Sequence, residues 1–71
     1  MKAKGPIEVS KDILGGTPVF RGTRVPVQTF IEYLEGGAAI DLFLADFPTV
    51  KREQVIEFLR MVKEDLLPSV A

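Results

Sequence analysis

The amino-acid sequence predicts a mainly α-helical domain: a trihelical, homeodomain-like helix-turn-helix core with a short β-type or extended N-terminal arm. Apolar residues recur at helical spacing in three segments, and glycine or proline follows each of them. Residues 7–25 instead hold short β-prone pieces separated by glycines, which predicts the arm. The expected domain covers 7–67, with its three helices in 26–67. A flexible N-terminus at 1–6 is expected before it and a short tail at 68–71 after it.

The first helix is predicted from Val27 to a pair of glycines. Its apolar stripe has the spacing i, i+3, i+4, i+7 and consists of Val27, Phe30, Ile31 and Leu34. Pro26 suits the first helical turn, because an N–H there would have no intrahelical partner. Gly36-Gly37 is expected to end the helix and to supply a residue for a left-handed cap.

The second and third helices are predicted in the same way. The second stripe consists of Ile40, Phe43, Leu44 and Phe47. Pro48 ends that helix, because the residue before a proline avoids helical geometry. The third helix is predicted from about Val50 to Leu66, with Thr49 as its N-cap. Its main stripe, flanked by Ile56 and Phe58, consists of Val55, Leu59, Val62 and Leu66.

The arm contains the stretch GGTPVFRGTRVPV. Gly15-Gly16 is predicted to form a turn with positive φ, a backbone that glycine adopts without steric cost. A phosphate-binding loop is not expected, because no helix follows the pair and no Gly-Lys-Ser/Thr stands at the required spacing. Arg21 and Arg24 flank Gly22-Thr23. They are expected to pair with a partner or with the acidic residues of the middle third, and a nucleic-acid phosphate is the second choice. Those acidic residues are Glu32, Glu35, Asp41 and Asp46.

Composition excludes several classes of protein. The 71 residues include no Cys and no His, which removes disulfides, thiolate chemistry and zinc sites built on these ligands. No apolar run approaches the roughly 20 residues that span a bilayer, and no apolar signal segment follows the N-terminal lysines. We therefore expect a cytoplasmic protein without a membrane partner. The chain is 46% hydrophobic, which is high for a small domain, and its surplus apolar surface is expected to meet another chain.

The distribution of charge bears on nucleic-acid binding. Residues 1–25 carry a net charge of +3, residues 26–50 of −4 and residues 51–71 of 0. In a helix-turn-helix the start of the last helix faces the major groove, so the candidate DNA-binding residues are Lys51, Arg52 and Gln54. Phosphates would repel Glu53 and Glu57 on the same helix. Operator DNA therefore remains a possible partner, but the sequence favours a protein partner over it.

The sequence shows no catalytic constellation. Asp41 and Asp46 are five residues apart and therefore point to different sides of a helix. Glu32 and Glu35 have a spacing that could hold a cation but is more often found on a solvated helix face. We expect no enzymatic activity, no cofactor, no metal and no small-molecule substrate.

Several large apolar residues lie off or beside the main stripes and form the predicted interface. They are Leu42, Phe58, Met61 and Leu67. On so small a chain, such residues indicate self-association or a protein partner, and a homodimer is expected.

Taken together, these segments resemble the domain-of-unknown-function family numbered 433. The resemblance covers about Ile7 to Leu66 and is carried by GGTPVFRGTRVPV, YLEGG, FPTV and REQVIEFL. It implies a small prokaryotic protein with a helix-turn-helix-related fold, the antitoxin of a type II toxin–antitoxin module that is paired with a PIN-like ribonuclease toxin. The chain departs from the family pattern at Thr17, often Lys, at Ala38-Ala39, often a Ser cap, and at Lys51, often a Thr cap. These changes predict a less firmly capped second helix.

The leading hypothesis is an antitoxin-like protein that neutralises its toxin by direct binding, with autoregulation of transcription through the helix-turn-helix left open. Because only Ser69-Val70-Ala71 follows Pro68, the toxin is expected to meet a folded surface or the basic arm rather than a long disordered tail. The alternative is a dimeric protein-interaction module that does not bind DNA.

Overall fold

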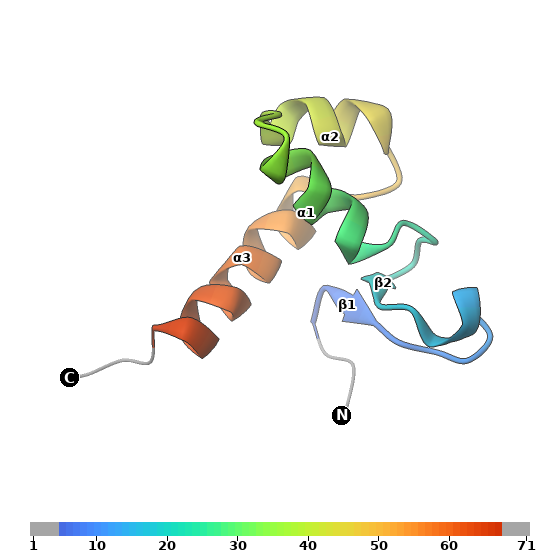
Figure 1. Cartoon of the computed structure of the whole chain (residues 1–71). Coiled ribbons are helices and arrows are strands. Elements are labelled where there is room, and N and C mark those ends of the chain that lie inside the picture. Colours follow the sequence, from blue (N-terminus) through green and yellow to red (C-terminus); the bar gives the residue numbers. More distant parts are fainter. Residues whose placement is uncertain (1–4, 68–71) are drawn as a thin grey trace.

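The computed structural model describes residues 5–67, which form three α-helices and one two-stranded antiparallel sheet (Figure 1). In chain order the elements are β1 (Ile7–Glu8), the 3₁₀ turn η1 (Leu14–Gly16), β2 (Val19–Phe20), α1 (Val27–Glu35), α2 (Ile40–Asp46) and α3 (Arg52–Leu66). The prediction of a mainly helical chain with a short β-type arm is confirmed. Of the predicted flexible N-terminus and tail, residues 1–4 and 68–71 lie outside the described residues.

The arm is a very short sheet that depends on the core. Ile7 lies opposite Phe20, and Glu8 lies opposite Val19. A hairpin this short is marginal by itself in water. Both residues of β2 are 0% exposed, so burial of Val19 and Phe20 holds the arm in place.

A sharp turn at Gly22 leads from the sheet to the helices. Gly22 has a φ of +80°. The Thr23 hydroxyl donates to the Phe20 carbonyl (2.8 Å) and accepts from the Val25 amide (3.0 Å). The Phe20 amide in turn donates to the Val25 carbonyl at 3.1 Å. These bonds reverse the chain, and α1 begins two residues later.

The glycine pair of the arm forms the left-handed turn that was predicted. Gly15 and Gly16 have φ values of +67° and +99°. Leu14 beside them is also left-handed, with a φ of +49°, a conformation that costs a residue with a Cβ about 1–2 kcal/mol. The Thr17 hydroxyl closes the turn by donating to the Leu14 carbonyl at 2.9 Å.

Helix α1 ends as predicted and begins slightly differently. Gly37 adopts a φ of +85°, and its amide donates to Leu34 while the Ala38 amide donates to Tyr33, both at 2.9 Å. This pair of bonds is a Schellman cap, in which glycine takes the left-handed position. Pro26 lies just before the helix as its N-cap, with extended backbone, rather than inside the first turn.

The start of α3 corrects a predicted cap. The N-cap is Lys51, not Thr49, and the helix begins at Arg52. Val50 is only 3% exposed and its amide donates to the Phe47 carbonyl at 3.0 Å, so a turn that buries Val50 stands where the first helical residue was expected, and the backbone is extended at Lys51. The Gln54 side chain then accepts the Lys51 amide at 2.9 Å, which is the reciprocal half of a capping box.

The core is a cluster of aromatic rings held by the arm and all three helices. The buried hydrophobic residues are Val19, Phe20, Val27, Phe30, Phe43, Val50 and Val55. Phe20 lies at the centre: its ring centroid is 6.0 Å from those of Phe30 and Phe43 and 6.1 Å from that of Phe58. These spacings favour edge-to-face packing. Each predicted apolar stripe therefore contributes one or two buried residues to one core: Val27 and Phe30, Phe43, and Val55.

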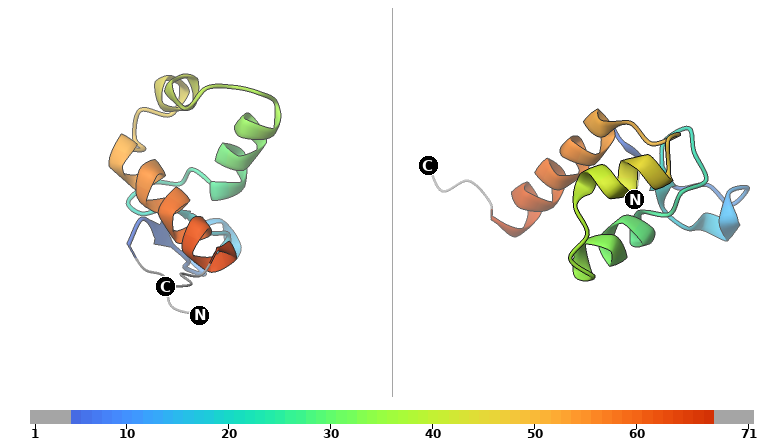
Figure 2. Two further views of the ribbon diagram at one scale, coloured as in Figure 1. Left: turned by 90° about the vertical axis from the view of Figure 1, so that its left-hand side faces the viewer. Right: turned by 90° about the horizontal axis from the view of Figure 1, so that it is seen from above.

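Some residues of the predicted stripes are not covered. Helix α3 extends away from the body of the molecule, as Figures 1 and 2 show. Leu66 near its end is 73% exposed, and Ile31 and Leu34 on α1 are 42% and 38% exposed. Within residues 5–67, no element packs over these members of the stripes. The radius of gyration is 12.6 Å, against about 11 Å for a compact chain of this length.

Candidate functional site

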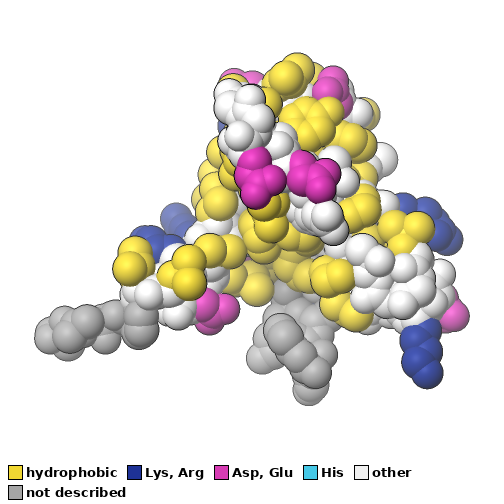
Figure 3. Space-filling model, viewed as in Figure 1, with side chains coloured by type: hydrophobic (Ala, Val, Ile, Leu, Met, Phe, Trp, Pro, Cys, Tyr) yellow, Lys and Arg dark blue, Asp and Glu magenta, His cyan; other side chains and the backbone are white. Residues whose placement is uncertain are grey.

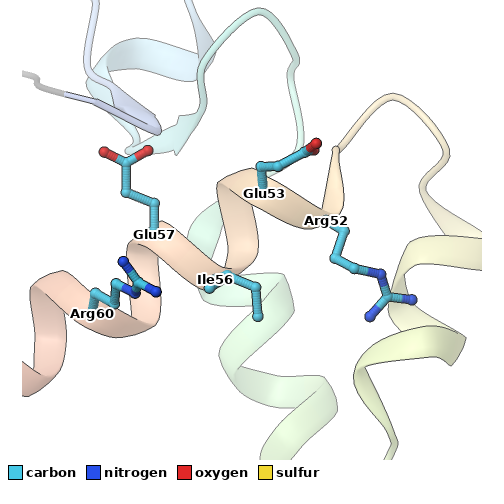
Figure 4. Close-up of a pocket in the computed structure, with 5 residues that line it drawn as sticks. All are labelled: Arg52, Glu53, Ile56, Glu57 and Arg60. Atoms are coloured by element: carbon cyan, nitrogen blue, oxygen red, sulfur yellow. The ribbon is translucent and has the colours of Figure 1, made fainter.

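The first half of α3 carries a shallow hollow of about 410 Å³, lined by Arg52, Glu53, Ile56, Glu57 and Arg60. We call it the α3 hollow. Figure 4 shows Glu53 and Glu57 pointing toward the arm, Arg52 pointing toward α2, and Ile56 lying between Arg52 and Arg60. Ile56 is 39% exposed. The hollow therefore combines an apolar centre with charged groups of both signs.

Arg52 is held by the neighbouring helix. Its guanidinium donates to the Asp41 carboxylate in the first turn of α2, and the two form an ion pair. Their side chains are 59% and 77% exposed, so water screens the pair and its contribution to stability is small. The pair does matter for DNA recognition, because the Asp41 carboxylate opposes the charge of Arg52, one of the two cations predicted to contact DNA.

Gln54 is engaged within the chain. Its side-chain oxygen accepts the Lys51 amide, and its side-chain NH₂ donates to the Arg21 carbonyl, both at 2.9 Å. The structure thus brings the three predicted DNA-binding residues together at the start of α3. Only Lys51 and Arg52 are exposed there, whereas Gln54 is half-buried and ties the helix to the arm.

Arg21 fastens the N-terminal strand. Its Nε donates to the Gly5 carbonyl at 2.8 Å and its Nη2 donates to the Ile7 carbonyl at 3.0 Å. Its backbone amide also donates to the Pro6 carbonyl at 2.8 Å. Within residues 5–67 Arg21 does not pair with the acidic residues of the middle third, because the adjacent strand presents carbonyl groups within reach of its fork of donors.

Arg24 remains open. It is exposed and lines a second hollow of about 570 Å³, together with Glu8, Ile13, Gly22, Thr23, Val25 and Thr49. The ion pair within residues 5–67 is that of Arg52 with Asp41, so the expected pairing of Arg24 with an acidic helix does not occur within this part of the chain.

The predicted interface residues have different surroundings. Leu42 and Leu67 are 50% and 70% exposed, so their side chains are available to another molecule. Met61 is half-buried. Phe58 packs edge-on against Phe20 and Phe30 at the margin of the core. Phe58 is therefore partly covered by Phe20 of the arm, a contact that its spacing next to the main stripe could not show.

Tyr33 on α1 and Asp46 on α2 are titratable side chains that contact each other. Its hydroxyl donates to the Asp46 carboxylate at 2.6 Å. This hydrogen bond, with smaller contributions from burial and from the negative charge of Asp46, raises the pKa of Tyr33 above its ordinary value of 10.0. The phenol is thus kept protonated and acts as a hydrogen-bond donor between the helices.

We expect the titration of Tyr33 to show this contact directly. Because the folded pKa is raised, the contact stabilises the fold below pH 10 and is lost as the pH rises through the folded pKa. Tyr33 is the one tyrosine of the chain, so tyrosinate absorbance reports it alone. The midpoint should lie above 10.0 in the unaltered protein and fall toward it in Asp46→Asn. Asp41→Asn on the same helix is the control, and an unchanged midpoint in Asp46→Asn would contradict the contact.

The described residues contain no group of three or more acidic side chains placed to hold a metal ion. In the same part of the chain, every helix is too short or too polar to cross a membrane.

Comparison with known proteins identifies the family. Residues 7–60, which run from β1 through α1 and α2 to the middle of α3, match the family described as "Protein of unknown function (DUF433)". The chain belongs to this family. The resemblance inferred from the sequence is thereby confirmed, and the description of DUF433 assigns no function. The matched segment contains both arm arginines and the whole α3 hollow, and it ends at Arg60.

A curated protein is similar to most of this chain. The uncharacterized protein y4eO of Sinorhizobium fredii (strain NBRC 101917 / NGR234) is 40% identical over 53 residues, which is 75% of this chain. The chain spans only 24% of the length of that relative. No solved structure matches the chain.

Proposed function

We propose that this DUF433 chain is an antitoxin-like protein that neutralises a PIN-like ribonuclease toxin by direct contact through the α3 hollow. The class of partner is supported by the family resemblance of the arm and helix motifs. The site is supported by one observation: Ile56, 39% exposed, lies at the centre of a hollow whose other lining residues are charged. An exposed apolar residue inside a polar rim is the usual anatomy of a protein–protein contact.

The balance of charge around the hollow favours a protein over a nucleic acid. Two arginines and two glutamates line the hollow with Ile56, and Asp41 pairs with one of the arginines, so the surface has no net positive charge. The lining charges are Arg52, Arg60, Glu53 and Glu57. A nucleic-acid site requires a basic patch, because neutralised phosphates supply most of the affinity. Mixed charges instead set the register of a protein partner and exclude wrong ones.

The proposal predicts that Ile56→Ala weakens toxin binding about tenfold, because a central apolar contact is lost while the fold keeps its core. Calorimetric titration with a catalytically inactive form of the neighbouring gene's toxin measures this. Leu14→Ala, at a residue 49% exposed on the arm, is the matched control and should bind like the unaltered chain. Equal binding by Ile56→Ala would place the toxin elsewhere on the surface.

The antitoxin role has its own test. Co-expression of the unaltered chain with that toxin should relieve growth arrest and yield a complex that co-purifies. Failure of both would overturn the antitoxin proposal, whatever the Ile56 variant does.

Operator DNA is the second candidate partner, and the exposed position of Lys51 at the start of α3 favours it. The pair of changes Lys51→Ala and Arg52→Ala should then weaken binding to the protein's own promoter and flatten its salt dependence by about two phosphate contacts. If the unaltered chain does not bind the promoter at low salt, the α2–α3 pair serves as a scaffold for protein contacts alone.

A further inference from the structure

The second hollow, of about 570 Å³, is built by three separate segments of the chain. The arm before η1 supplies Glu8 and Ile13, the turn after β2 supplies residues 22–25, and the connection from α2 to α3 supplies Thr49. It shares no lining residue with the α3 hollow. In Figure 3, which has the view of Figure 1, basic side chains project from the side of the molecule that carries the arm, with hydrophobic and uncharged surface beside them.

The turn that carries Arg24 is fixed by the fold, whereas the Arg24 side chain is not used by it. The Thr23 hydroxyl donates to the Phe20 carbonyl at 2.8 Å and accepts the Val25 amide at 3.0 Å, so the backbone on both sides of Arg24 is held. Arg24 is exposed and forms no ion pair with residues 5–67. Its guanidinium is therefore available to an anion, and the turn does not need to be ordered when the anion binds.

Glu8 is attached to the same turn but does not neutralise Arg24. Its Oε1 accepts the Gly22 amide at 3.3 Å. Although Glu8 and Arg24 line the same hollow, they do not form an ion pair with each other. The half-buried side chains of Ile13 and Val25 add an apolar surface. The hollow therefore offers a ligand one cation, one anion and an apolar contact.

These groups favour a segment of protein over a nucleic acid or a free small molecule. The Glu8 carboxylate repels phosphate, and one carboxylate for one guanidinium is not the basic patch that a nucleic acid requires. Small molecules bind in cavities that bury most of their surface. Gly22, Arg24 and Thr49 are exposed, so this hollow is too open for that. A protein segment brings neighbouring residues that cover the open side.

We propose that the second hollow binds an extended segment of a partner protein, which presents a carboxylate to Arg24 and apolar side chains to Ile13 and Val25. The guanidinium donates to both carboxylate oxygens, an arrangement that its planar fork favours. Glu8 disfavours a segment with a second acid beside the first, which adds selectivity. The site goes beyond the toxin contact and does not depend on it, because that contact uses the α3 hollow.

A blocked pentapeptide tests this chemistry. In acetyl-Val-Ser-Glu-Ser-Val-amide, the carboxylate and both valines lie on one side of an extended backbone. Nuclear magnetic resonance titration of the isotopically labelled full chain should show saturable shifts of the amides of residues 22–25 and 49, with a dissociation constant of about 1 mM or tighter. The same peptide with Gln in place of Glu should bind at least about tenfold more weakly, because it keeps the shape but lacks the charge.

Changes in the chain locate the contact. Arg24→Gln should weaken binding of the glutamate peptide at least about tenfold and leave binding of the glutamine peptide unchanged. The spectrum of this variant also reports whether the fold is intact. Lys11→Gln is the matched control, because it removes an exposed cation of the arm that does not line the hollow. Ile56→Ala, in the α3 hollow, should bind the peptide normally.

The alternatives have distinct outcomes. The proposal is overturned if the glutamate peptide causes no saturable shift at about 10 mM, if the two peptides bind equally, or if Arg24→Gln binds like the unaltered chain. A short single-stranded oligonucleotide that shifts the same amides at a lower concentration than the peptide would overturn it in favour of a nucleic-acid site.

Discussion

Replacing Phe20 with alanine is expected to lower the free energy of unfolding by about 3 to 5 kcal/mol. Phe20 is 0% exposed, and its ring contacts those of Phe30, Phe43 and Phe58. The alanine variant loses both the burial of the ring and the packing of the three rings around the cavity it leaves. A domain of this size has about 4 to 10 kcal/mol of stability in total, so the variant should lose about a third of it or more. Urea denaturation followed by circular dichroism measures the loss.

A second phenylalanine provides the comparison for this prediction. Phe47 is half-buried at the edge of the cluster, where its ring meets Tyr33 and Phe43. Phe47→Ala should therefore lose clearly less stability than Phe20→Ala. Phe20→Leu, which keeps most of the volume, should retain a cooperative transition. If Phe47→Ala proves the more damaging variant, the arm does not supply the centre of the core.

Arg21→Ala is expected to cost about 2 kcal/mol, because two charge-assisted hydrogen bonds, one to β1 and one to the residue two positions before it, are lost at an exposed site. The two carbonyls that the guanidinium holds are those of Gly5 and Ile7. Without it the N-terminal strand should separate more often from β2. Hydrogen exchange of the backbone amide at position 21, which donates to the Pro6 carbonyl in the unaltered chain, should therefore become faster in the variant.

Arg24→Ala is the matched control, with the same change of residue type three positions along the chain. Its side chain is exposed and lines the second hollow, so its loss should change stability by less than about 0.5 kcal/mol. Arg21→Lys should recover only part of the loss, since an ammonium group lacks the planar fork that reaches two carbonyls. Equal stability of the two alanine variants would show that Arg21 does not fasten the strand.

The parts of the fold that the sequence predicted correctly depend on local geometry. Gly37 and the Gly15-Gly16 pair were identified as left-handed because glycine alone adopts positive φ cheaply. The end of α2 before Pro48 follows from a clash between neighbouring residues. These signals operate over a few residues, so no tertiary contact is needed to recognise them.

The parts that the sequence missed depend on residues far apart in the chain. Thr49 was expected to cap α3, but the burial of Val50 moved the helix start to Arg52. Gln54 was expected to face DNA, but the carbonyl of Arg21, 33 residues earlier, accepts its side chain. No sequence pattern around Arg21 or around Gln54 predicts that contact.

By itself, then, the sequence determined the order and type of the elements, the apolar side of each helix, the turns at glycine and the family. The tertiary structure alone decided which flank of each stripe is covered, and so left Ile31, Leu34 and Leu66 at the surface. It also decided that the Arg21 side chain binds carbonyl groups of the N-terminal strand region, whereas the Arg24 side chain is exposed and lines the second hollow. The physical reason is one of range. Backbone conformation and helical periodicity are properties of adjacent residues, whereas burial and hydrogen-bond partners exist only once the arm and α3 have packed on the same core.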